Sequence, residues 1–175
     1  MKFAASHAIY CAPMRLVLSV LLFSFHSNLL AAAGARFAEV DRFWADISES
    51  VSDGDYGAYR SAHHPDAVLV VNGASCSMES AHQAFRRGFE DTAAGTVEAG
   101  IEFLWKQRSV DANTAFQKGA FRYWSEAAGS TYSQYTQFEA ILVKGDKGWK
   151  LLVQKQYKPM TREQWDALID GKKED

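Results

Sequence analysis

The feature that most restricts the fold of this chain is a change in the spacing of its apolar residues. From residue 97 onward they recur at every second position, so that Val97, Ile101 and Phe103 alternate with Glu98 and Glu102. In a strand, successive side chains point to opposite faces, so apolar residues at every second position lie on the same face. This spacing therefore predicts strands with one buried face. Four long strands are expected in succession, over residues 97–106, 115–124, 132–144 and 149–158, with a tight hairpin turn between the last two.

Before this region the apolar residues follow the helical period instead. Phe37, Val40, Trp44, Ile47 and Val51 are separated by three or four positions. This spacing aligns them along one stripe of a helix, which therefore has one face to bury.

Two shorter helices and one strand are expected between these regions. Asp55 is a suitable N-cap for a short helix that must end before Pro65. Residues 67–71 form a continuous apolar run, which is typical of a buried strand. Ser80 and Gln83 have the spacing of a capping box and predict the start of a third helix.

This order of elements predicts an α+β domain, with helices segregated to one face of the sheet. Because long strands form twisted sheets that curl, we expect a cone-shaped, curved antiparallel sheet. Three N-terminal helices should pack over its concave face, and a short C-terminal helix should follow the sheet at Thr161. The hollow between helices and sheet is then the default place for a ligand.

The first 35 residues have the pattern of an export signal. Lys2 and Arg15 make the segment basic, it contains no acidic residue, and residues 16–25 form an apolar run. Small residues precede two possible cleavage points, after Ala33 or after Ala35. A run of this length is shorter than the about 20 apolar residues that cross a bilayer, so no membrane span is expected after processing.

Cleavage would leave one domain over residues 36–170 and a charged tail over residues 171–175, in the periplasm or outside the cell. An uncleaved anchor or a buried N-terminal helix is the alternative, and Met14 is a possible second start. Cys76 would be the only cysteine left, which rules out an internal disulfide, and we expect it to be a small buried residue.

The charge balance also limits the partners of this chain. With 19 Lys+Arg against 21 Asp+Glu and a net charge of −2, it lacks the basic surface of a nucleic-acid binder. No cofactor is predicted, since there is no glycine-rich phosphate loop. His63, His64, Asp66 and His82 lack the spacing of metal ligands and are interpreted as a polar helix end.

Several short strings occur in the order found in one superfamily. They are Gly-Asp at 54–55 between the first two helices, His-Pro-Asp-Ala-Val-Leu at 64–69, and Gly-Trp-Lys-Leu at 148–151. Residues 37–158 resemble the nuclear transport factor 2-like superfamily, and most closely its SnoaL-like and uncharacterised bacterial branches, with the ketosteroid-isomerase-like fold. The resemblance implies a conical barrel with a pocket at its open end and homodimers formed through the sheet. Its members include enzymes, ligand binders and assembly modules, so the fold leaves the function open.

The resemblance also implies where the acid–base groups of an isomerase would lie. A general-base carboxylate would stand near Val71, a tyrosine near Ile47 and a carboxylic acid near Ala140. None of these positions has the required side chain, and the neighbouring Glu139 should point to the opposite face of its strand. Proton abstraction beside a carbonyl needs such groups, so the sequence disfavours an isomerase and no catalytic residue is predicted.

We expect a pocket lined by aromatic side chains with one polar group. The predicted lining residues are Trp44, Tyr59, Val71, Phe103, Trp105, Phe121, Tyr123, Phe138 and Gln154, with Gln156 as the alternative to Gln154. Tyr132, Tyr135 and Gln137 are the candidates for the outer sheet face, where a dimer partner would cover them.

The leading hypothesis is therefore an exported domain that binds a small apolar molecule without catalysis. An isomerase, cyclase or dehydratase that uses His63, His82, Asp66 or Glu139 is the first alternative. A homodimeric assembly module with a filled pocket is the second.

Overall fold

The computed structural model describes residues 14–171, so the predictions made for residues 1–13 and 172–175 lie outside the described residues. The chain divides into two compact units, Met1–Ala35 and Arg36–Asp175. The described part of the first unit is helical and belongs to the first helix of the chain. Among the described residues, no helix has both the length and the apolar character needed to cross a membrane.

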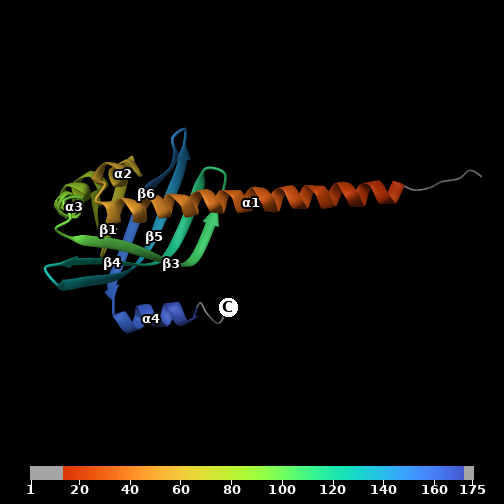
Figure 1. Ribbon diagram of the computed structural model, residues 1–175. Coiled ribbons are helices and arrows are strands. Elements are labelled where there is room, and N and C mark those ends of the chain that lie inside the picture. The colour runs from red at the N-terminus through yellow and green to blue at the C-terminus, as the bar shows by residue number, and fades with distance from the viewer. Residues whose placement is uncertain (1–13, 172–175) are drawn as a thin grey trace, which may run out of the picture. The chain divides into compact units, whose positions relative to one another are not determined.

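Helices and strands follow one another along the chain in the predicted order, with one additional short strand before the third helix (Figure 1). The elements are α1 (Met14–Asp53), α2 (Tyr56–Ser61), β1 (His63–Val71), β2 (Ala74–Ser77), α3 (Met78–Ala93), β3 (Glu98–Val110), β4 (Thr114–Ala127), β5 (Ser130–Gly145), β6 (Gly148–Met160) and α4 (Arg162–Gly171).

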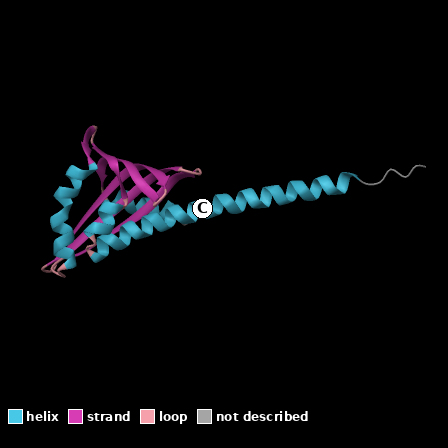
Figure 2. Ribbon diagram, turned by 90° about the horizontal axis from the view of Figure 1, so that it is seen from above, coloured by secondary structure: helices cyan, strands magenta, loops and turns pink. Residues whose placement is uncertain are grey.

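The six strands form one curved sheet in the order β2-β1-β6-β5-β4-β3 (Figure 2). The α+β class is confirmed, but the sheet is mixed, because β1 pairs with β6 in parallel while every other neighbour is antiparallel. β1 and β6 are far apart in the sequence, so no hairpin forces them to run in opposite directions.

The strand β2 was not predicted. It pairs with β1 across a two-residue turn at Asn72 and Gly73, which have φ angles of 51° and 86°. Two successive positive φ angles are characteristic of a type I′ hairpin turn, for which Asn-Gly is the preferred sequence. All four residues of β2 are exposed, so Cys76 is an exposed thiol and the prediction that it is buried was wrong.

The helix ends show which local predictions hold. The Asp55 side chain accepts a hydrogen bond from the Ala58 backbone N–H at 2.8 Å, as expected for the N-cap of α2. Helix α3 begins earlier than predicted, at Met78, because Ser77 is its N-cap and accepts from the Ser80 N–H at 3.3 Å. Ser80 therefore lies inside the first turn.

The predicted stripe of α1 lies against the concave face of the sheet. Val40, Trp44, Ile47 and Val51 of this stripe are buried and Phe37 is half-buried, while Phe43, which was not part of the predicted stripe, is buried as well. The turn that follows α1 comes close to the C-terminal end of α3, and a Cβ atom at Gly54 would lie 2.4 Å from the Ala93 backbone nitrogen. With a φ of +70° as well, this position requires glycine.

The convex face of the sheet is covered in part by α4. Thr161 and Gln164 form the predicted reciprocal capping box at its start. Trp165 is buried, and its ring lies 5.5 Å from the ring of Tyr135 on β5. Since Tyr135 is one of the residues predicted on the outer face, the structure places α4, rather than a second copy of the chain, over this part of it.

Candidate ligand-binding cavity

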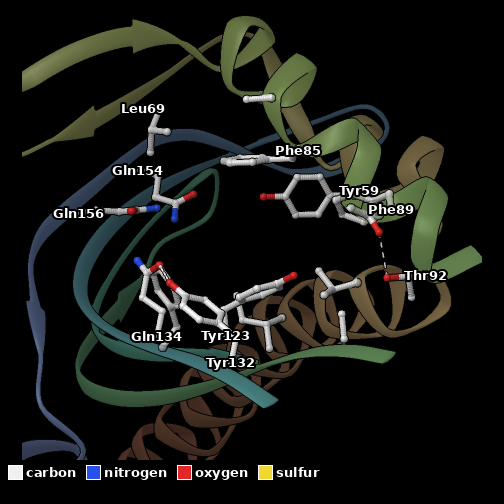
Figure 3. Close-up of a pocket in the computed structure, with 16 residues that line it drawn as sticks. Tyr59, Leu69, Phe85, Phe89, Thr92, Tyr123, Tyr132, Gln134, Gln154 and Gln156 are labelled. Carbon is white, nitrogen blue, oxygen red and sulfur yellow. Dashed lines mark hydrogen bonds between the residues drawn. The ribbon is translucent and has the colours of Figure 1, made fainter. Parts of the chain in front are cut away.

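A cavity of about 380 Å³ lies between α3 and the inner face of the sheet (Figure 3). Helix α3 supplies one wall and strands β3 to β6 supply the opposite one. Its lining consists of Val51, Tyr59, Leu69, Ala84, Phe85, Gly88, Phe89, Thr92, Ala99, Ile101, Phe121, Tyr123, Tyr132, Gln134, Gln154 and Gln156.

The α3 wall is one face of an amphipathic helix. Ala84, Gly88 and Thr92 are four residues apart and lie on this face together with Phe85 and Phe89. Apart from its own turn of the helix, a Cβ atom built at Gly88 meets no atom of the described residues within 4 Å, so the helix backbone borders open space at this position. Phe85 is 39% exposed, which leaves much of its ring free for a further apolar contact.

The sheet wall carries three glutamines. Gln134 is already engaged, because it accepts a hydrogen bond from the Tyr132 hydroxyl at 2.9 Å and donates one to Thr136 Oγ1 at 3.2 Å. Gln154 and Gln156 lie two residues apart on β6 and therefore on the same face. Neither of their amides has a hydrogen-bond partner among the described residues.

Tyr59 brings a hydroxyl group to the cavity from the helical side. Its ring packs against the rings of Phe89 and His63 at centroid distances of 4.8 and 4.9 Å. Its hydroxyl points into the cavity, toward the wall with Gln154 and Gln156 (Figure 3). Burial raises the pKa of Tyr59 to about 12, so the group stays a neutral phenol and cannot act as a base near pH 7.

Two buried histidines lie behind Tyr59 and do not line the cavity. The rings of His63 and His82 are 4.6 Å apart, and His63 Nδ1 donates a hydrogen bond to the Tyr59 carbonyl oxygen at 2.8 Å. Burial lowers the pKa of His63 to about 4, and burial also lowers the pKa of His82. Both imidazoles are therefore neutral near pH 7, and they support Tyr59 rather than face a ligand.

The other candidate acid–base residues point away from the cavity. Glu139 lies on the outer face of the sheet, as predicted, and its carboxylate binds Lys118 Nζ at 2.8 Å. This lysine, through its hydrogen bond and its charge, lowers the pKa of Glu139. Asp66 is exposed and lies 3.7 Å from His64. Among the described lining residues there is no carboxylate, imidazole, ammonium, guanidinium or thiol group.

A metal site is not apparent in the part of the chain that the structure describes. Within residues 34–171, whose side chains the structure describes, no three or more His, Cys, Asp or Glu side chains are placed together to hold an ion.

The structure separates the predicted lining residues into three sets. Tyr59, Phe121, Tyr123 and Gln154 lie on the cavity wall, together with the alternative Gln156. Val71 is the last residue of β1 and is 36% exposed. The remaining four are packed together in the core beside the cavity: Trp44, Phe103, Trp105 and Phe138.

These four residues do not border the cavity because the ring of Trp44 fills the space beside the other three. Its ring centroid lies 4.8 Å from Phe103, 5.0 Å from Trp105 and 5.8 Å from Phe138. The stripe of α1 thus occupies this part of the concave face, and the cavity lies where α3 covers the sheet.

Sequence reasoning missed two parts of the lining. Phe85 and Phe89 of α3 were not among the predicted lining residues, since the sequence does not say which part of the sheet this helix covers. Tyr132 was placed on the outer face, but it lies on the inner one with Gln134. The signal was present, because Tyr132, Gln134 and Phe138 are an even number of residues apart on one strand.

A model of the SnoaL-like domain family matches residues 40–157, which is most of the chain. The chain belongs to the SnoaL-like domain family. The match includes every residue on the wall of the cavity. No protein of curated function matches the sequence significantly.

Solved structures similar to this SnoaL-like domain share its fold. A conserved protein from Planctomyces limnophilus has a TM-score of 0.61 at 13% identity, over 73% of this chain and 99% of its own. An NTF2-like protein with a cystatin-like fold from Novosphingobium aromaticivorans has a TM-score of 0.55 at 16% identity, over 77% of this chain and 86% of its own. A ketosteroid isomerase-like protein from Erwinia carotovora has a TM-score of 0.51 at 16% identity, over 74% of this chain and 96% of its own. These likenesses establish the fold alone.

Proposed function

We propose that this SnoaL-like domain binds a small, uncharged and largely apolar molecule in the cavity under α3. The observation that carries the proposal is a cavity of about 380 Å³ whose described lining has no charged group. Cavities of this size, with apolar walls and a few polar groups, are typical of small-molecule sites.

The lining also determines which ligands are disfavoured. A carboxylate or ammonium group would leave water without gaining an opposite charge, because the described lining supplies none. The hydroxyl groups of Tyr59 and Tyr123 and the amides of Gln154 and Gln156 instead suit neutral donors and acceptors. Binding without acid–base chemistry is the function that fits this set of side chains.

The experiment is a binding screen with matched variants. Neutral apolar compounds and their carboxylate analogues are tested by thermal shift and by native mass spectrometry. We expect neutral compounds to bind and to stabilise the domain, and Gly88→Leu, which adds a side chain inside the cavity, to weaken that binding. Gln83→Leu, on the exposed side of the same helix, is the control. The absence of any bound neutral compound, or equal binding by Gly88→Leu, would contradict the proposal.

We further propose that the domain acts after export. The boundary between the two compact units falls after Ala35, which is one of the two predicted cleavage points. Intact-mass measurement of the protein from the periplasm or the medium tests this. We expect the mass of a chain that begins at residue 34 or 36, and the mass of the full-length chain would refute the proposed export.

We also propose a homodimer formed through the outer sheet face that α4 leaves uncovered. Ile141 is 38% exposed there and is paired in register with Phe116 on β4 and Val153 on β6. Light scattering should show a dimer that Ile141→Lys converts to a monomer. A wild-type monomer would contradict this proposal without affecting the one on ligand binding.

A further inference from the structure

Two amides with unused hydrogen-bonding capacity stand side by side on the sheet wall of the cavity. Gln154 and Gln156 project from β6 into the same space and face the hydroxyl of Tyr59 (Figure 3). Gln134, the third glutamine, differs because Tyr132 and Thr136 already occupy its oxygen and its nitrogen. The first two therefore remain available to a ligand.

The donor and acceptor atoms of these two amides determine which ligand groups they can bind. Each ends in an oxygen that accepts and a nitrogen that donates, whichever way the group is rotated. Two such groups together match a ligand edge with an N–H beside a C=O. A lone ketone would use only the donors and would leave the amide oxygens buried without a partner, which is unfavourable.

The remaining walls favour a flat ligand. Phe85 and Phe89 on α3 and Tyr123 and Tyr132 on the sheet line the cavity, so that aromatic side chains border it on both sides (Figure 3). The open space at Gly88 allows a ring to approach the helix backbone between the two phenylalanines. Aromatic walls of this kind stack on planar rings.

From this juxtaposition we propose that the cavity selects an uncharged planar ring system with a lactam or imide edge, held by the amides of Gln154 and Gln156. The inference rests on the proposed binding function and names its ligand class. Tyr59 contributes a third hydrogen-bonding group, which as a neutral phenol donates to a ligand carbonyl or accepts from its N–H.

The test uses three tricyclic compounds of nearly the same shape: 6(5H)-phenanthridinone, its N-methyl derivative and phenanthrene. The first has the lactam N–H and C=O, the second lacks the N–H, and the third lacks both. Dissociation constants are measured by fluorescence titration for the wild type, for Gln154→Met and Gln156→Met, and for the control Gln137→Met. Gln137 is exposed on the outer face of β5, and methionine keeps the length of glutamine without its hydrogen bonds. Circular dichroism melts establish that each variant is folded.

We expect the lactam to bind about tenfold more tightly than its N-methyl derivative, as one or two neutral hydrogen bonds provide. This preference should be lost in the Gln154 and Gln156 variants and kept in the Gln137 variant. Equal binding of all three compounds, or a preference that survives both inner variants, overturns the inference but leaves an apolar binding site. Failure of all three compounds to bind counts against the proposed function as well.

Discussion

Substitution of Gly88 tests directly the space under α3 that this residue borders. Glycine in the middle of a helix destabilises it by about 1 kcal/mol relative to alanine, because its backbone loses more freedom on folding. Close packing is the usual reason to keep such a glycine. Here a Cβ atom would meet nothing within 4 Å, so packing does not explain it.

Gly88→Ala should therefore raise the free energy of unfolding by about 1 kcal/mol. For a domain of this size, that corresponds to a rise of about 4 °C in the melting temperature. The assay is urea unfolding followed by circular dichroism, together with a thermal melt. Gly54→Ala is the contrasting variant and should be strongly destabilising, because its Cβ would lie 2.4 Å from the backbone nitrogen of Ala93.

The result that refutes this reasoning is a loss of stability in Gly88→Ala. It would mean that another group occupies the space beside Gly88 in the folded protein. The cavity would then be smaller than the structure indicates, and the proposed ligand site would lose one wall.

Three further predictions concern the histidine pair and the sheet. Burial lowers the pKa of His63 to about 4 in the folded protein, below its ordinary 6.5. As the pH falls, this histidine is therefore protonated in the unfolded chain before it is protonated in the folded protein. Stability should be full above pH 6.5 and decrease by about 3 kcal/mol between pH 6.5 and 4. Urea titrations across this range measure it, and a flat profile would contradict it. His82→Leu should raise the free energy of unfolding by about 1 kcal/mol, since both ring nitrogens of His82 are buried with no hydrogen-bond partner among the described residues. A large loss of stability in the same assay would reveal a polar contact of this ring. Gly119→Ala should lower the free energy of unfolding by more than about 2 kcal/mol, because the new Cβ would lie 2.0 Å from the Leu104 carbonyl oxygen. A melting temperature like that of the wild type would contradict this and show that β3 and β4 can separate locally.

The periodicity of the sequence predicted most elements because each element buries one face. The stripe from Val40 to Val51 and the alternation that begins at Val97 depend only on neighbours within the same helix or strand. Such patterns are visible without knowledge of the partner surface. The N-cap Asp55 is equally local, since donor and acceptor are three residues apart.

The candidate site could be predicted only in part, because a wall is made by elements that are distant in the sequence. The inward direction of Phe121, Tyr123 and Gln154 follows from strand alternation. An inward aromatic side chain can line a cavity or pack against another ring. The helix that covers that part of the sheet decides between the two. Trp44 packs over Phe103, whereas Tyr123 borders the cavity that Gly88 also lines.

The sequence by itself determined the α+β class and the order of all elements except β2. Tertiary structure decided that β1 runs parallel to β6, that α4 covers the outer face at Tyr135, and that the amides of Gln154 and Gln156 share one cavity. The physical reason is that a periodic pattern specifies which side of an element is buried. Only the packing of the whole chain specifies what lies against that side, and therefore where space for a ligand remains.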